Sequence, residues 1–113
     1  MNMKTITGKS VNSQMVHNYF SSLVDCFFKI LPMKEEGEST LATYMRSLQI
    51  ELIGCQALIS SINNDSSYLT LLSILQFLID TPECEVYEVR REIFRAISIC
   101  NKLKARYAEE VLK

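Results

Sequence analysis

Apolar residues recur every three to four positions along four stretches of the chain, and short polar segments separate these stretches. This spacing places the apolar side chains on one face of a helix, so it indicates amphipathic helices rather than strands. We expect helices over about 11–31, 41–62, 67–80 and 82–111. The short connections between them favour antiparallel neighbours.

Capping residues and prolines predict where these helices begin and end. Pro32 is expected to end the 11–31 helix, because the residue before a proline is disfavoured in helical geometry. Ser39 or Thr40 is expected to cap the second helix. Thr81 followed by Pro82 predicts the start of the fourth, with threonine as the cap and proline at the first helical position.

The 67–80 stretch is apolar over more than half of its circumference, roughly 220° of the helical wheel. A helix of this kind is typical of a central position, so we expect the other three to surround it. Gly54, inside the second helix, is either a tolerated weak point or a site of close approach by another helix.

The expected fold is therefore all-α: a compact antiparallel bundle of four helices with a long C-terminal helix. We expect a flexible N-terminus over 1–10 and a single domain over 11–113. A chain of 113 residues that is 48% hydrophobic can bury a core of its own. The low count of three glycines and two prolines argues against a sandwich or barrel, which need many turns.

Cysteine spacing and hydropathy predict a cytoplasmic location without a membrane segment. Cys26, Cys55, Cys84 and Cys100 are far apart and form no CxxC pair, which indicates small apolar core residues in a reducing compartment rather than zinc ligands. The longest apolar stretch, 19–31, is broken by polar and charged residues, so we do not expect it to span a bilayer. Residues 1–10 lack the apolar core of a signal peptide.

The sequence contains no recognisable catalytic, cofactor-binding or metal-binding constellation. His17 is the only imidazole, and its place at the edge of the polar face of the 11–31 helix points to a surface residue. Glu88 and Glu92 share a helix face with Arg91 and Arg95, which favours a salt-bridge lattice over acid–base catalysis. We therefore expect a protein that is not an enzyme and needs no cofactor.

Basic residues gather on the last helix, where residues 90–113 carry seven basic and three acidic groups. Four of the basic residues lie within roughly 40° of one another on the wheel and form an expected exposed ridge. They are Arg91, Arg95, Lys102 and Arg106. Two interpretations stay open: contact with an acidic protein or nucleic acid, and a solvated face in which glutamates interleave with the ridge.

The 11–31 helix carries more apolar surface than a peripheral helix needs, again roughly 220° of its circumference. Part of it is therefore a candidate interface for a protein partner or a second copy of the chain; the alternative is irregular packing that buries it internally. The candidate contact residues are Tyr19, Phe20, Phe27 and Phe28.

The run from Leu72 to Arg91 is similar to the C-terminal half of the small helical regulators of biofilm-connector type in enteric bacteria. The similarity consists largely of helical periodicity. The long last helix and the Pro32–Glu38 segment have no clear counterpart in those proteins. The similarity therefore assigns no family.

These patterns favour a non-catalytic helical interaction module: an accessory subunit, adaptor or small regulator that binds a protein partner or forms a homo-oligomer. Such a module predicts binding with little salt dependence that is lost on Phe20→Asp or Phe27→Asp. The second hypothesis is a small nucleic-acid-associated protein that uses the basic ridge, and it predicts binding that weakens steeply with salt.

Overall fold

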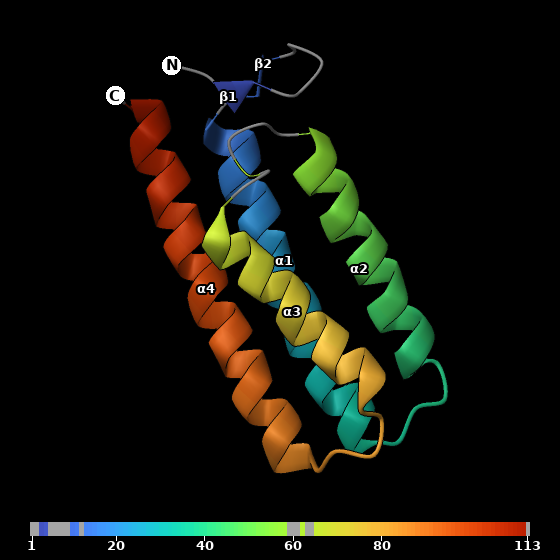
Figure 1. The fold of residues 1–113 in the computed structure, drawn as a ribbon. Coiled ribbons are helices and arrows are strands. Elements are labelled where there is room, and N and C mark those ends of the chain that lie inside the picture. The colour runs from blue at the N-terminus through green and yellow to red at the C-terminus, as the bar shows by residue number, and fades with distance from the viewer. Residues whose placement is uncertain (1–2, 5–9, 12, 59–61, 63–64, 113) are drawn as a thin grey trace.

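The structure is a computed structural model that describes all residues except 1–2, 5–9, 12, 59–61, 63–64 and 113. Four helices run alternately up and down (Figure 1). Their bounds are α1 Ser13–Glu35, α2 Leu41–Leu58, α3 Ser66–Asp80 and α4 Val86–Leu112. The expected all-α bundle with a long C-terminal helix is confirmed.

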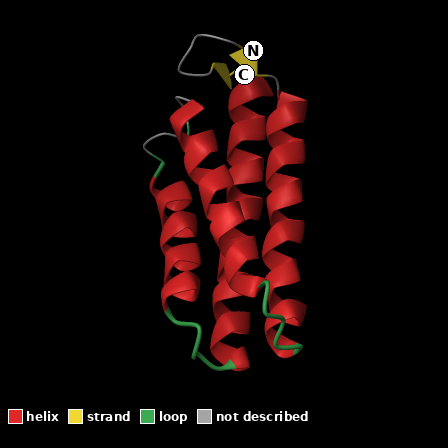
Figure 2. Cartoon of the chain, turned by 90° about the vertical axis from the view of Figure 1, so that its right-hand side faces the viewer, coloured by secondary structure: helices red, strands yellow, loops and turns green. Residues whose placement is uncertain are grey.

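The N-terminal segment contributes a short antiparallel pairing of β1 Met3–Lys4 with β2 Ser10–Val11. Figure 2 shows this pair at one end of the bundle, whereas the α1–α2 and α3–α4 connections lie at the opposite end. The rest of the expected flexible segment 1–10 lies outside the described residues.

The prediction that the first helix ends at Pro32 is wrong, because α1 continues through Pro32 to Glu35. Its end is a Schellman motif, in which Glu38 N donates to Met33 O at 3.0 Å and Gly37 N donates to Lys34 O at 3.1 Å. Gly37 supplies the left-handed backbone that this motif requires, with φ of 65°. The capping motif therefore sets the end of α1.

The fourth helix begins at Val86 rather than at Pro82, so the prediction from Thr81 and Pro82 is wrong. Thr81 instead caps the C-terminus of α3, where its backbone N–H bonds to Phe77 O. The start of α4 is fixed by Glu88, whose carboxylate accepts a hydrogen bond from Glu85 N at 3.3 Å, as in half of a capping box.

The core runs along the bundle axis, and α1 and α4 form the most extensive helix pair. The prediction of a central third helix is wrong: α3 packs on α2 and α4 and exposes Leu69 and Phe77 to solvent. Its other face is buried as expected, through Tyr68, Leu71, Ile74, Leu75 and Leu78. Each helix of the bundle therefore keeps one face directed outward.

Candidate functional site

The outward face of α4 carries two exposed aromatic side chains one above the other. Tyr87 and Phe94 are seven residues apart, which is two helical turns, and they are 64% and 50% exposed. Phe28 of α1 is 45% exposed and meets Phe94 edge to face, with ring centroids 5.8 Å apart and an interplanar angle of 87°. These three rings form an exposed aromatic group that spans α1 and α4.

The predicted basic ridge lies beside this aromatic group on the exposed side of α4. Arg91 and Arg95 both contact Glu92, with N–O distances of 3.4 and 3.0 Å. Glu92 is only 9% exposed, so the two guanidinium groups hold a carboxylate at the edge of the core. This part of the ridge is a salt-bridge lattice, and both arginine side chains remain more than half exposed.

Arg106, at the far end of the ridge, joins α4 to the start of α3. It contacts Asp65 Oδ2 at 2.5 Å, while Asp65 Oδ1 accepts hydrogen bonds from Ser67 N at 2.9 Å and Tyr68 N at 3.1 Å. Asp65 is thus both the N-cap of α3 and the partner of Arg106. Lys102, between these ion pairs, is exposed.

Hereafter we call this surface the aromatic–basic face. It comprises Tyr87, Phe94 and Phe28 together with the ridge residues Arg91, Arg95 and Lys102. The structure thus brings together one residue from the predicted interface of the first helix and three from the predicted ridge of the last.

The other predicted contact residues of the first helix do not belong to this face. Phe20 and Phe27 are fully buried in the core, so the prediction that they meet a partner is wrong for the folded chain. Tyr19 is half-buried and packs against the core. An apolar arc on the wheel cannot show which part of it the neighbouring helices cover, and α2 and α4 cover most of this one.

Sequence reasoning missed Tyr87 and Phe94, although the sequence contains a signal for them. Both lie off the apolar stripe through Val89 and Ile93, on the side of the wheel that the charged residues occupy. An aromatic residue on a polar helix face is the pattern that would have identified this surface.

Tyr19, Tyr68 and Cys55 form a polar cluster inside the bundle. Tyr68 Oη donates to Leu52 O at 2.7 Å and lies 3.4 Å from Tyr19 Oη. Burial raises the pKa of both phenols and of the Cys55 thiol above their ordinary values, which keeps all three groups protonated at neutral pH. A protonated thiol is a weak nucleophile, so the cluster serves to join α1, α2 and α3.

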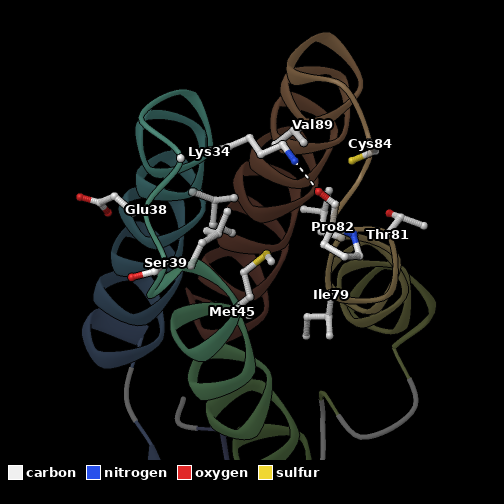
Figure 3. Close-up of a pocket in the computed structure, with 14 residues that line it drawn as sticks. Lys34, Glu38, Ser39, Met45, Ile79, Thr81, Pro82, Cys84 and Val89 are labelled. Carbon is white, nitrogen blue, oxygen red and sulfur yellow. Dashed lines mark hydrogen bonds between the residues drawn. The ribbon is translucent and has the colours of Figure 1, made fainter.

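A pocket of about 280 Å³ opens at the end of the bundle, where the α1–α2 and α3–α4 connections meet. Its lining includes one buried residue from each helix: Ile30, Met45, Leu78 and Val89. Figure 3 shows Lys34 reaching across the pocket mouth, where Nζ donates to Pro82 O at 2.7 Å. Sequence reasoning did not identify this pocket.

His17 is exposed, as its place on the polar edge of the helix predicted. Over the part of the chain that the structure describes, no three His, Cys, Asp or Glu side chains are grouped to hold a metal ion. Within the same residues, no helix is both long and apolar enough to cross a membrane.

No protein family, no curated protein sequence and no solved structure matches the chain.

Proposed function

We propose that this chain is a non-catalytic helical interaction module of the cytoplasm, and that the aromatic–basic face binds an acidic protein. The observation that carries the proposal is the edge-to-face contact between Phe28 and Phe94, which leaves both rings about half exposed. Two helices thus present one continuous aromatic surface to solvent. The free thiols of the four cysteines fit a reducing compartment.

The composition of this face is that of a protein contact. Tyrosine, phenylalanine and arginine are enriched at protein interfaces, and binding energy concentrates on such anchors where they become buried. Tyr87, Phe94 and Phe28 supply the aromatic anchors, and Arg91 and Arg95 supply the adjoining arginines. Isolated exposed apolar residues are ordinary, but a group of aromatic rings beside a basic ridge favours a partner.

The charge of α4 favours an acidic partner. From 86 to 106 the helix carries six basic groups and two acidic ones, and one of the acidic groups, Glu92, is already paired with two arginines. Self-association through this face would bring two positive ridges together, so a different, acidic protein suits it better than a second copy of the chain.

Nucleic acid is the weaker alternative for the same ridge. Three of its four members, Arg91, Arg95 and Arg106, already contact carboxylates of this chain. Any anionic partner has to compete with these carboxylates for the guanidinium groups. This competition weakens nucleic acid more than a protein, because nucleic acid binds mainly through its phosphates, whereas a protein also contacts the aromatic rings. The steepness of the salt dependence separates the two partners, because each neutralised phosphate adds to the slope.

The test is quantitative affinity capture from the native source with the wild-type chain and three matched variants. Phe94→Ser removes an aromatic anchor, and Lys102→Glu reverses an exposed charge on the ridge without disturbing Glu92. Ile50→Ser is the control, because Ile50 is the most exposed apolar residue on α2, across the bundle from α4 (Figure 1). Circular dichroism verifies that each variant retains its helices.

The proposal predicts an acidic protein that the wild type and Ile50→Ser capture equally. We expect at least a tenfold loss of that protein with Phe94→Ser, because truncating an interface anchor costs about 2 kcal/mol. Equal capture by all four chains, or capture lost only with Ile50→Ser, would contradict the proposal. Nuclease-sensitive capture of nucleic acid would support the alternative.

A further inference from the structure

The pocket at the end of the bundle is a place where the core remains unfilled. Its inner wall is made by four buried aliphatic side chains, one from each helix, and Leu41 and Ile79 extend this apolar wall. Exposed residues of the two connections, including Glu38 and Pro82, lie on its rim, so a solute can enter from solvent. The volume is close to the lower limit of ligand pockets, roughly 300 Å³.

Among the described residues that line the pocket, Lys34 provides the only positive charge. Its ammonium lies at the mouth and donates one hydrogen bond to Pro82 O, while an ammonium has three donors to offer. Glu38 also belongs to the rim, but its side chain points away from Lys34 (Figure 3). The pocket therefore combines an aliphatic interior with a single cation at its entrance.

We infer that this pocket binds a monocarboxylic acid with a short alkyl chain, on the order of six to ten carbons. The alkyl chain lies against the aliphatic wall, and the carboxylate accepts a charge-assisted hydrogen bond from Lys34 Nζ at the mouth. Such a bond is stronger than the bond to the neutral Pro82 carbonyl. This site is at the end of the bundle and does not depend on the aromatic–basic face.

The chemistry of the lining distinguishes this class of ligand from others. The described residues of the lining include no aromatic side chain on which a planar ring could stack, and one ammonium suits one carboxylate better than a polyanion. An alkylamine would place its positive charge beside Lys34, and an alcohol would lose the charge-assisted bond. The carboxylate headgroup is thus the feature that the site selects.

The test is a titration of the full chain with octanoate, octanol and octylamine, followed by isotope-edited NMR. Lys34→Met keeps the length of the side chain and removes its charge. Lys29→Met is the matched control, because Lys29 is an exposed lysine of the same helix outside the pocket lining. Ala42→Phe, at an exposed position of the lining, adds a ring to fill the space.

We expect octanoate to shift the resonances of Ile30, Met45 and Val89, and to bind more tightly than hexanoate by up to about fourfold per added methylene. Lys34→Met should weaken octanoate binding about tenfold, Lys29→Met should leave it unchanged, and Ala42→Phe should weaken it. Three results would overturn the inference: no octanoate binding at millimolar concentration, octanol or octylamine binding as tightly as octanoate, or full affinity in Lys34→Met.

Discussion

Tyr68 is the residue at which three helices of the bundle meet. It is fully buried on α3, donates a hydrogen bond to the Leu52 carbonyl of α2 and lies beside the Tyr19 hydroxyl of α1. A buried hydroxyl costs free energy unless it is paired, and here both of its roles, donor and acceptor, are used. This pairing explains how an apolar core accommodates two phenols.

Replacing Tyr68 with phenylalanine should lower the free energy of unfolding by about 1–2 kcal/mol, because buried polar groups lose a hydrogen-bond partner. Tyr87→Phe is the matched control, since Tyr87 is exposed and its hydroxyl donates a long hydrogen bond of 3.4 Å to Glu88. Urea unfolding followed by circular dichroism measures both. Equal stability of the two variants would show that the internal hydrogen bonds contribute little.

Cys100 should be the least reactive thiol of the folded chain. It is fully buried, and burial raises its pKa to about 12, so very little thiolate exists at neutral pH. Cys84 is only half-buried, in the α3–α4 connection. Iodoacetamide labelling with mass spectrometry should modify Cys84 first and Cys100 only after unfolding; early labelling of Cys100 in the native chain would contradict its place in the core.

The raised pKa of Cys100 also sets a direction for the pH dependence of stability. The folded state holds this proton more strongly than the unfolded state, so its contribution is complete below pH 9, the ordinary pKa of a thiol, and is lost as pH rises toward 12. Burial also raises the pKa of Tyr44 to about 12, so the stability that this phenol contributes is likewise lost as pH rises above 10. Urea unfolding should show stability falling from pH 8.5 to 10.5, and a constant or rising stability would contradict the burial of these groups.

At the scale of whole elements, helix ends were the part of the fold that the sequence predicted least well. Pro32 was expected to stop α1, but the helix continues through it to Glu35, and the Schellman motif at Gly37 then ends the helix and satisfies the Met33 and Lys34 carbonyls. Thr81 and Pro82 have the residue types of a helix start, yet the chain uses them to leave α3. Threonine and proline occur both where helices start and where they end, and tertiary packing decides which of these roles Thr81 and Pro82 take.

The two described glycines of the helical region should respond to alanine in opposite directions. Gly37 has a left-handed backbone, so Gly37→Ala should destabilise the chain by about 1 kcal/mol. Gly54 lies in α2 with no described atom within 4 Å of an added methyl group, so Gly54→Ala should stabilise it by about 0.5–1 kcal/mol. Thermal unfolding measures the melting temperature of both variants. Shifts of the melting temperature in the same direction would contradict the prediction.

The candidate site was only partly predictable, because it also depends on how the helices pack against one another. Periodicity identified the apolar arc of α1 and the ridge of α4, but it could not show that Phe20 and Phe27 face inward while Phe28 faces out. That distinction depends on which neighbours pack against the helix. The end pocket was not predictable at all, because it is formed by side chains from four helices at once.

At the scale of the whole molecule, α1 and α4 are the two longest helices of the bundle and form its most extensive helix pair. The molecule measures 44 × 23 × 20 Å, and α4 runs along nearly all of the longest dimension. Its inward face contributes to the core, and its outward face carries Tyr87, Phe94 and the ridge, beside Phe28 of α1. The last helix thus packs into the core on one side and presents most of the surface that we propose for binding on the other.

A photo-crosslinking amino acid at position 94, compared with the same amino acid at position 50, tests the proposed contact surface most directly. We predict a covalent adduct with an acidic protein from position 94 in the native source, and no such adduct from position 50, on α2 across the bundle. High salt before irradiation should reduce the adduct only slightly, because the aromatic rings contribute to binding along with the charge of the ridge. An adduct from position 50 alone, or none from position 94, would contradict the assignment of the aromatic–basic face.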